Sequence, residues 1–364
     1  MHTPLRVGIV GLSASGGWAA AAHVPALQHL PDFELVAGTA SSPESTRAAV
    51  ENFGLPHSFG SPAEMAESDE VDVFVVTIKV PLHEAALGPA LRAGKIVVCE
   101  WPLASDSTQA RELASAASSP TFVGLQARSA PSIRYLTDLI ADGYVGEVLS
   151  TTVVGSGGTW GAEVDPRNAY TLDNRTGATM LTIPFGHAID AVCMALGEFT
   201  SVTATLATRR ATVLESGTGR TLPMTAPDQV AVTGVLDSGA VVAAHYRGGV
   251  SAATNFRWEI NGTHGDLVIT ADSGHVQMSE LTIHGSQRGA QLEVLPIPAR
   301  YDLVDREFAR NSPRAYNVAS AYAQIAADLR DGTTVTPTFE HAVMRHAFLD
   351  LAARSTDSAV HIPR

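Results

Sequence analysis

Cysteine is nearly absent from this sequence of 364 residues, which contains only Cys99 and Cys193. Both stand in apolar runs, so we expect a buried, reduced pair, and a disulfide-based framework is excluded. Basic residues are also scarce, because 24 lysines and arginines accompany 37 aspartates and glutamates, for a formal net charge of -13. Such a charge argues against nucleic acid or an anionic membrane as a partner.

Long apolar runs are missing as well. No apolar run of membrane-spanning length, no signal peptide and no internal repeat occurs, so we expect a cytoplasmic protein. No Cys/His cluster has metal-ligand spacing, and no Gly-x-Ser-x-Gly sequence is present, so we expect neither a metal site nor a nucleophile of that kind. The length exceeds what one hydrophobic core usually supports, which predicts two domains.

Residues 1–125 alternate short apolar strands with helical segments. Strands that are apolar throughout and alternate with helices indicate a parallel sheet that is covered on both faces. We therefore predict an α/β Rossmann domain, that is, a doubly wound sheet, over residues 1–125. The expected strands are 5–11, 34–39, 71–78, 96–99 and 121–125, and the expected helices are 18–30, one that starts at Pro43, 82–92 and 107–117.

Residues 126–364 have a different pattern, because strands follow one another with short polar turns such as Asp237-Ser238-Gly239. This pattern predicts an α+β domain with a large open, mostly antiparallel sheet. Helices at 180–196, 315–330 and 340–353 are expected to cover one face, with packing of the C-terminal helices on the first domain as the alternative. A loop is expected at 214–227. The expected strands are 147–156, 200–209, 229–236, 240–247, 255–261, 266–270 and 275–284.

A glycine-rich stretch directly after the first strand has the spacing of a dinucleotide-binding loop. It reads Gly11-Leu12-Ser13-Ala14-Ser15-Gly16, with a serine where the middle glycine of that fingerprint normally stands. Its place between a buried strand and a helix favours pyrophosphate binding at the helix N-terminus over an ordinary glycine-rich turn. The predicted cofactor contacts here are Gly11, Ser13, Ala14, Gly16, Gly17 and Trp18.

The end of the second strand bears on the choice of cofactor. An acidic residue there would bind the adenosine ribose hydroxyls and disfavour a 2′-phosphate. The chain instead has Thr39-Ala40-Ser41-Ser42, and its next carboxylate is Glu44. Ser41 and Ser42 are therefore predicted contacts of NADP(H), which we favour over NAD(H).

Taken together, these segments resemble the glucose–fructose oxidoreductase, inositol dehydrogenase and rhizopine-catabolism family (Gfo/Idh/MocA). The resemblance implies a Rossmann domain, a second domain with an open sheet, and oxidation or reduction of a sugar or polyol with NAD(P). It also implies a homodimer or homotetramer that associates through the sheet. The matching stretches are 7–17, 73–83, 93–104, 124–128, 143–148, 186–190 and 261–267.

More narrowly, the chain resembles the Glu-Trp-Pro branch that includes the fungal galactose-regulon repressor. The shared features are the loop from Gly11 to Ala19, the tripeptide Glu100-Trp101-Pro102 and the segment 185–190. That repressor binds a dinucleotide but works by contacting a transcriptional activator. The branch therefore implies an alternative function, a catalytically silent NAD(P)-binding regulator that acts through a protein partner.

The resemblance also identifies what is missing from the catalytic set. Family members share proton transfer among a lysine, an aspartate and a histidine, at positions that match Trp101, Ile183 and His187. Trp101 cannot carry a mobile proton, so the usual lysine mechanism is excluded. His187 remains as the candidate proton relay, since histidine titrates near neutral pH. The alternative is a histidine that is kept for packing.

Lys79 is a second candidate, because it lies just past the carboxyl end of a predicted central strand, the edge where doubly wound sheets bind ligands. A contact with the phosphates or ribose of the cofactor is the first interpretation. A displaced catalytic amine and a solvent-facing lysine are the alternatives.

The remaining predicted contacts follow from their places beside these segments. Aromatic rings next to hydrogen-bonding groups suit a sugar, although a loop without a binding role explains each residue nearly as well. Asp190 follows His187 by three residues on one helix, so it could also orient the imidazole. Further cofactor contacts are predicted at His83, Glu100, Trp101, Pro102 and Gln126, and substrate contacts at Trp101, Arg128, Trp160, Tyr170 and Asp190.

Overall fold

The computed structural model describes residues 3–355, and the chain forms two compact units. Unit 1 comprises residues 3–130 and 302–344. Unit 2 comprises residues 131–301 and 345–355. The boundary thus falls after Ala130 rather than after residue 125, and a C-terminal segment returns to the first unit.

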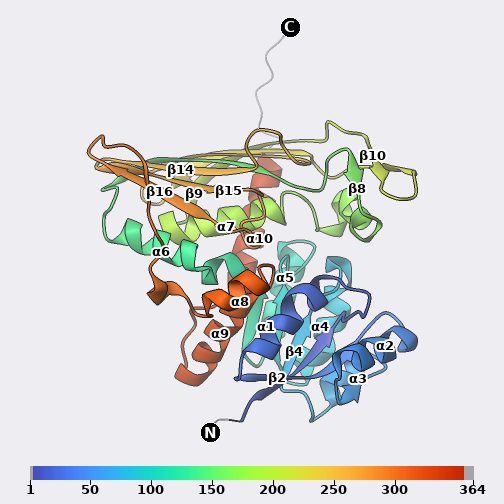
Figure 1. Cartoon of the computed structure of the whole chain (residues 1–364). Helices are drawn as coiled ribbons and strands as arrows, with labels where there is room; N and C mark the ends of the chain where they lie inside the picture. The colour runs from blue at the N-terminus through green and yellow to red at the C-terminus, as the bar shows by residue number, and fades with distance from the viewer. Residues whose placement is uncertain (1–2, 356–364) are drawn as a thin grey trace. The chain divides into compact units, whose positions relative to one another are not determined.

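Unit 1 is built on a parallel sheet of six strands in the order β3-β2-β1-β4-β5-β6 (Figure 1). This is the strand order of a doubly wound dinucleotide-binding fold, in which strands are added on one side of β1 up to β3 and on the other side from β4 onward. The predicted Rossmann domain is confirmed. The strands are β1 (Leu5–Val10), β2 (Phe33–Thr39), β3 (His57–Ser58), β4 (Val73–Val76), β5 (Ile96–Glu100) and β6 (Thr121–Gly124).

Helices cover this sheet, and three of them begin at a residue whose side chain caps them. Ser42, Ser61 and Asp106 each accept a hydrogen bond from a backbone N–H of the first turn, as N-cap residues do. The helix expected at 18–30 begins with a π-helical turn. The elements are η1 (Ala19–His23), α1 (Val24–His29), α2 (Pro43–Phe53), α3 (Pro62–Glu67), η2 (Val80–Leu82), α4 (His83–Arg92), α5 (Ser107–Ser115) and η3 (Gln126–Ser129).

The returning segment adds α8 (Arg306–Asn311) and α9 (Tyr316–Asp331) to unit 1. Val318, Tyr322 and Ile325 of α9 are buried in the same core as residues of β1, β4 and α1. The helix expected at 315–330 therefore completes the Rossmann core instead of covering the second sheet, which is the alternative placement that the sequence allowed.

Unit 2 is built on an eight-stranded sheet in the order β17-β16-β15-β14-β7-β13-β12-β9. Neighbouring strands are antiparallel except β7 and β13, which run parallel, so the predicted open, mostly antiparallel sheet is confirmed. The strands are β7 (Val148–Ser156), β9 (Phe199–Ala207), β12 (Gln229–Leu236), β13 (Val241–Arg247), β14 (Phe256–Gly262), β15 (Gly265–Ala271), β16 (Thr282–Gln287) and β17 (Glu293–Val294).

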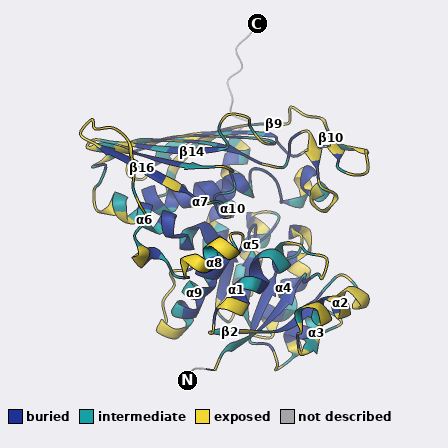
Figure 2. Ribbon diagram, in the orientation of Figure 1, coloured by how far each residue is buried: buried dark blue, intermediate teal, exposed yellow. Residues whose placement is uncertain are grey.

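One face of this sheet is covered by helices (Figures 1 and 2). On β13, Val242, Ala244 and Tyr246 are buried and the residues between them are exposed or half-buried, as expected for a sheet with one covered face. Almost every residue of α7 is buried. The helical elements are α6 (Pro131–Ala141), η4 (Pro166–Leu172), η5 (Asn174–Thr176), α7 (Pro184–Leu196), η6 (Ala299–Tyr301) and α10 (Phe339–Ser355), the last shared with unit 1 up to Met344.

Two predicted segments of unit 2 were wrong. The strand expected at 275–284 begins only at Thr282, because the residues before it form a turn that is tied down by a hydrogen bond from the Tyr246 hydroxyl to the Gly274 carbonyl. The loop expected at 214–227 contains parts of a small three-stranded sheet. Its strands are β8 (Glu163–Val164), β10 (Thr212–Glu215) and β11 (Thr221–Pro223).

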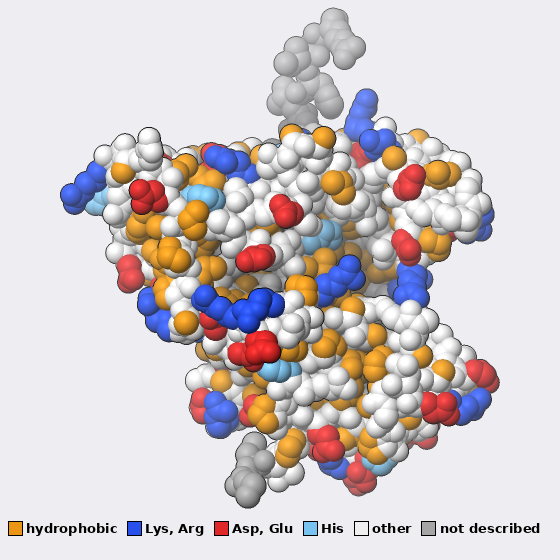
Figure 3. All heavy atoms as spheres, in the orientation of Figure 1, with side chains coloured by type: hydrophobic (Ala, Val, Ile, Leu, Met, Phe, Trp, Pro, Cys, Tyr) orange, Lys and Arg blue, Asp and Glu red, His pale blue; other side chains and the backbone are white. Residues whose placement is uncertain are grey.

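Two features of the structure relate to nucleic acid and membranes, the partners that the net charge argues against. In the face drawn in Figure 3, acidic and basic side chains of the described residues lie interspersed, and neither sign covers a broad area. Within residues 3–355, no helix is long and apolar enough to cross a membrane.

Candidate functional site

The dinucleotide loop begins where β1 ends, and its first glycine is required by the surrounding atoms. Gly11 has a φ of +97°, and a Cβ there would lie 2.7 Å from Cγ2 of Ile78 and 2.9 Å from Oγ1 of Thr77. The backbone N–H groups of Gly11 and Leu12 donate to the Thr39 carbonyl, at 2.9 and 3.0 Å. The loop is therefore fixed against the carboxyl ends of β2 and β4.

Ser13 occupies the place of the middle glycine without blocking the loop. Its Oγ accepts a hydrogen bond from the Ser15 N–H at 3.3 Å, so the side chain folds back on its own loop. Gly16 and Gly17 both have positive φ, of 99° and 115°, and a Cβ at Gly17 would meet no heavy atom within 4 Å. These residues leave open backbone before η1, as pyrophosphate binding requires.

At the end of β2 the side chains are small, and no carboxylate takes the position that favours NAD(H). Ser42 is the N-cap of α2, and its Oγ accepts from the Ser45 N–H at 3.2 Å. Glu44 pairs with Arg47 at 3.6 Å on the exposed surface of α2. Thr39 Oγ1 is buried and has no hydrogen-bond partner.

Glu100 lies at the carboxyl end of β5 and is the centre of a hydrogen-bonded array. Its Oε1 is 3.0 Å from His23 Nε2, and its Oε2 accepts from Gln126 Nε2 at 3.4 Å. His23 Nδ1 lies 2.8 Å from the Tyr322 hydroxyl. Gly124 leaves room for the carboxylate, since a Cβ there would lie 2.8 Å from Glu100 Oε1. The array brings the predicted residues Glu100 and Gln126 together, and His23 and Tyr322 were not predicted.

His83 is not available to a cofactor, which corrects the prediction. The side chain is 1% exposed, and its Nδ1 and Nε2 each lie 3.0 Å from a backbone carbonyl, of Leu103 and Ile78 respectively. Burial lowers the pKa of His83, and a neutral imidazole has one N–H, so one of the two contacts is a hydrogen bond. The residue fixes the turn that carries Lys79, which is exposed and precedes η2.

The tripeptide after β5 has its tryptophan inside the protein. Trp101 is 5% exposed, and the peptide bond between Trp101 and Pro102 is cis. A buried indole gives this position an apolar ring and no titratable group.

His187 lies in the first half of α7, in unit 2, where its imidazole is buried. The side chain is 3% exposed, and Nδ1 has no hydrogen-bond partner. Burial, together with the nearby His275, lowers the pKa of His187 to about 3, and Asp190 opposes this shift only weakly. The His187 N–H donates to the carbonyl of Ile183 one turn earlier, and Ile183 adds no polar side chain. The imidazole is therefore neutral near pH 7.

Asp190 is occupied by an ion pair, so the predicted substrate contact is not supported. Its Oδ1 accepts from Arg345 Nε at 3.1 Å, and both side chains are almost fully buried. Arg345 also donates to both oxygens of Glu198, at 2.8 and 3.2 Å, and lies 3.2 Å from the Cys193 sulfur. Burial raises the pKa of the Cys193 thiol to about 12, and both cysteines are free, as expected.

Trp160 is a packing residue rather than a substrate contact. It is 2% exposed, and its indole N–H donates to the Thr171 carbonyl at 2.9 Å. Tyr170, in η4, is half-buried, and burial raises the pKa of its hydroxyl group. Arg128, in η3 of unit 1, is also half-buried. A substrate contact thus stays a prediction for Tyr170 and for Arg128.

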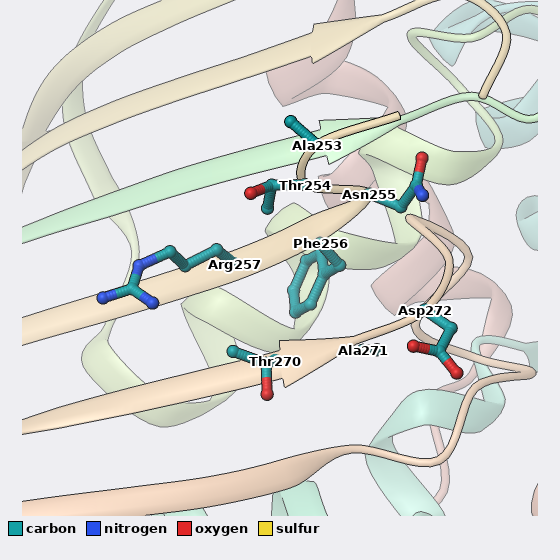
Figure 4. A pocket seen from close by; sticks show the side chains of 8 residues that line it. All are labelled: Ala253, Thr254, Asn255, Phe256, Arg257, Thr270, Ala271 and Asp272. Carbon is teal, nitrogen blue, oxygen red and sulfur yellow. The ribbon is translucent and has the colours of Figure 1, made fainter. Parts of the chain in front are cut away.

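A hollow of about 370 Å³ opens on unit 2, where β14 begins and β15 ends (Figure 4). Two of its polar side chains, those of Asn255 and Arg257, are engaged within the protein. Asn255 Oδ1 accepts from the Ser156 hydroxyl and the Ser251 N–H, both at 2.8 Å, and Arg257 pairs with Glu259 on its own strand. None of the predicted site residues lines it, so it is not the candidate site. No group of three potential ligands among the described residues is arranged to hold a metal ion.

Comparison with known proteins assigns separate family matches to the two units of the chain. Residues 5–123 match the model of the oxidoreductase family with an NAD-binding Rossmann fold (Gfo/Idh/MocA), and residues 131–271 match the C-terminal domain of Gal80p. The galactose/lactose metabolism regulatory protein GAL80 of Kluyveromyces lactis is 32% identical over 305 residues, which cover 77% of this chain and 67% of that protein.

Two further relatives represent the two functional classes. The dehydrogenase aclE of Aspergillus oryzae is 34% identical over 212 residues, which cover 56% of this chain and 57% of that protein. The crystal structure of a super-repressor mutant of Gal80p from Saccharomyces cerevisiae superposes with a TM-score of 0.87 at 26% identity, over 98% of this chain and 96% of that one. The resemblance inferred from sequence is confirmed. The chain belongs to the Gfo/Idh/MocA family, with a Gal80-like C-terminal domain.

Proposed function

We propose that the protein is an NAD(P)-dependent oxidoreductase that acts on a CH–OH group of a sugar, a polyol or a sugar-like substrate. The observation that carries the proposal is the buried, neutral imidazole of His187, whose Nδ1 has no hydrogen-bond partner. A buried polar atom without a partner is costly in a folded protein, and a substrate hydroxyl would satisfy it. The dehydrogenase aclE, 34% identical over its aligned part, supports an enzyme.

The residues at the carboxyl edge of the Rossmann sheet fit a dinucleotide. Gly11 is required by its neighbours, and three buried polar atoms of unit 1 near this edge have no hydrogen-bond partner, namely Trp18 Nε1, Thr39 Oγ1 and Gln126 Oε1. The loop from Gly11 to Trp18 would hold the pyrophosphate, and Lys79 would contact the phosphates or a ribose. The bound nicotinamide would supply the hydride acceptor or donor.

We favour NADP(H) over NAD(H). Ser41 and Ser42 leave room for a 2′-phosphate, and no carboxylate at the end of β2 would repel it. This preference for NADP(H) depends only on side chains of unit 1.

Proton transfer would rest on His187 without the lysine and aspartate that family members use. With its proton on Nε2, the His187 imidazole presents a lone pair on Nδ1 to the substrate hydroxyl and receives its proton. Trp101 fills the place where the family's lysine would stand with a buried apolar ring, so this position supplies no mobile proton. Arg128 and Tyr170 are the remaining candidates for contacts with substrate hydroxyls, and Lys79 is the candidate for a displaced catalytic amine.

The test is to supply NADP+ or NAD+ with a panel of sugars and polyols and to follow the absorbance of the reduced nicotinamide. Turnover by the wild type that is lost in His187→Gln supports the proposal. His284→Gln is the matched control, because the Nδ1 of His284 is also buried without a partner in unit 2 and the residue has no proposed role. Its turnover should match the wild type.

A regulator that binds a dinucleotide and acts through a protein partner is the second candidate. Three observations favour it. Trp101 and Ile183 replace the family's lysine and aspartate, and an imidazole with a pKa of about 3 is a weak general base at neutral pH. The 32% identity to a galactose/lactose metabolism regulatory protein agrees with this class. Tight dinucleotide binding without turnover in either direction across the panel would favour the regulator.

For either function we propose a homodimer or homotetramer that associates through the uncovered face of the eight-stranded sheet. Val241 is 55% exposed on that face, and Ala243 of β13 and Thr203 of β9 are small exposed residues of the same face. Light scattering of the wild type should give an even multiple of the chain mass, and Ala243→Lys should reduce it. A monomeric wild type would contradict the assembly and leave the catalytic proposal standing.

A further inference from the structure

A buried chain of four hydrogen-bonded side chains in unit 1 fixes the orientation of one amide. The Tyr322 hydroxyl of α9 contacts His23 Nδ1 at 2.8 Å, and His23 Nε2 contacts Glu100 Oε1 at 3.0 Å. Glu100 Oε2 accepts from Gln126 Nε2 at 3.4 Å. Tyr322, His23 and Gln126 are each at most 3% exposed. The array therefore lies almost wholly inside the protein.

The carboxylate sets the direction of the hydrogen bonds that it receives. A carboxylate oxygen accepts, so His23 Nε2 donates to Glu100. The other ring nitrogen, Nδ1, forms the hydrogen bond with the Tyr322 hydroxyl. The same carboxylate takes the NH2 group of Gln126, because the opposite orientation of the amide would place two acceptors against each other.

One hydrogen-bond acceptor of the array, the Gln126 amide oxygen, has no donor. Gln126 Oε1 is not part of the bond to Glu100, and it is buried without a hydrogen-bond partner. A buried amide oxygen without a donor destabilises the folded protein unless a ligand supplies one. The atom thus calls for an N–H or O–H group from a bound molecule.

The position of Gln126 in the sheet indicates which part of a ligand supplies that donor. Glu100 ends β5, and Gln126 follows β6 by two residues. In the strand order β3-β2-β1-β4-β5-β6, these ends lie on the side of β1 opposite to β2. A dinucleotide whose pyrophosphate lies at the Gly11 loop and whose adenosine lies over β2 has its nicotinamide on this side. The donor there is the carboxamide NH2 group.

A second unsatisfied group belongs to the same array. The Trp18 ring contacts the His23 ring edge-on at a centroid distance of 6.3 Å, and Trp18 Nε1 is buried without a partner. A carboxamide has one acceptor oxygen and two N–H donors, so it offers a partner to an indole N–H as well as to an amide oxygen.

We infer that Tyr322, His23 and Glu100 hold Gln126 with its Oε1 toward the bound dinucleotide, where it accepts a hydrogen bond from the carboxamide of the nicotinamide ring. Gln126 is the binding residue, and the other three are positioning residues. The inference rests on dinucleotide binding by unit 1 under the proposed function, and it does not depend on catalysis.

Calorimetry with a cofactor analogue tests this contact directly. The probes are the dinucleotide that the wild type binds, NAD+ or NADP+, and its 3-acetylpyridine analogue, which has a methyl ketone in place of the amide. The wild type should bind the amide roughly three- to tenfold more tightly than the ketone, as one hydrogen bond to a buried acceptor implies. Gln126→Met keeps the length of the side chain and removes the acceptor, so it should bind the two probes equally.

Two further variants separate the hydrogen bond from general damage. Tyr322→Phe removes only the hydroxyl that orients His23, and it should reduce the discrimination without abolishing binding. Gln109→Met is the matched control, because Gln109 also donates its amide to a carboxylate of unit 1, that of Glu84 at 2.7 Å, on the exposed surface. Its discrimination should equal that of the wild type.

An unchanged ratio of the two affinities in a folded Gln126→Met variant would overturn the inference and leave the proposed function untouched. If that variant does not fold, Gln126→Asn, which retracts the acceptor, gives the same comparison. A wild type that binds neither probe would contradict dinucleotide binding itself, and the proposed function and the inference would then fall together.

Discussion

Asp190 and Arg345 form an almost fully buried ion pair, with 3.1 Å between Asp190 Oδ1 and Arg345 Nε and with side chains that are 1% and 0% exposed. Asp190 lies on α7 three residues after His187, and Arg345 lies on α10. The carboxylate that was predicted as a substrate contact instead joins α7 to α10. Glu198 is a second carboxylate that pairs with the same guanidinium group, at 2.8 Å from Arg345 Nη2.

Removal of Arg345 should strongly destabilise the protein. Arg345→Met leaves the Asp190 carboxylate buried without its partner, which typically costs about 3–5 kcal/mol in the free energy of unfolding. Urea denaturation followed by circular dichroism measures the loss. Arg330→Met is the matched control, because Arg330 pairs with Asp331 at 3.2 Å with both side chains more than half exposed. Such a pair contributes about 0–1 kcal/mol, and equal losses in the two variants would contradict the account.

The buried imidazole of His187 should make stability depend on pH below about 6.5. The pKa is lowered from 6.5 to about 3 in the folded protein, so between these values the unfolded chain binds more protons than the folded one. The free energy of unfolding therefore falls as the pH falls through this window, by up to about 1.4 kcal/mol per pH unit for one proton. His187→Gln removes this contribution.

Urea denaturation of the wild type and His187→Gln between pH 7 and pH 4.5 measures the difference in slope. The variant should lose less stability on acidification than the wild type. Parallel curves would mean that His187 titrates normally in the folded protein.

The two sheets could be read from the sequence because apolar runs and polar turns are local signals. The unbroken apolar run of β4 and the glycines after β1 suffice to predict a Rossmann domain. The errors have a different origin, since Asp190, Trp160 and His83 carry side chains typical of binding sites but are satisfied by other parts of the protein. The partner of Asp190 is 155 residues away along the chain, and His23 meets Tyr322 across 299 residues.

Two weak signals for the missed residues were nevertheless present. His23 ends a run of alanines in a helix that must be buried, and Arg345 directly follows the apolar run Ala342-Val343-Met344 in the last helix. A polar residue on a buried face requires a partner, but pairwise patterns in one sequence do not say which one.

The dinucleotide loop should lose its function when its first glycine acquires a side chain. Gly11→Ala forces a Cβ against Ile78 and Thr77 at a positive φ, so dinucleotide affinity should fall roughly ten- to hundredfold. Isothermal titration calorimetry measures the change. Gly143→Ala provides the control, because its φ is +75° but a Cβ there would meet nothing within 4 Å. That variant should bind the dinucleotide as the wild type does.

The choice between NADP(H) and NAD(H) should reverse when a carboxylate is placed at the end of β2. Ala40→Asp introduces a group that accepts from the ribose hydroxyls of NAD(H) and repels a 2′-phosphate. We expect the wild type to bind NADP+ more tightly, and the variant to favour NAD+ by about tenfold, which corresponds to one charged hydrogen bond. Tighter binding of NAD+ by the wild type would show that the small residues after β2 do not select the phosphate.

Hydride transfer with His187 as the proton acceptor is the central claim, and the most direct measurement is the rate of nicotinamide reduction across the substrate panel for three proteins. These are the wild type, His187→Gln and His284→Gln, each shown by calorimetry to bind the dinucleotide. The account predicts turnover with at least one substrate by the wild type and His284→Gln, and a loss of about 100-fold or more in His187→Gln. Undiminished turnover in His187→Gln, or none in a wild type that binds the dinucleotide tightly, would contradict it.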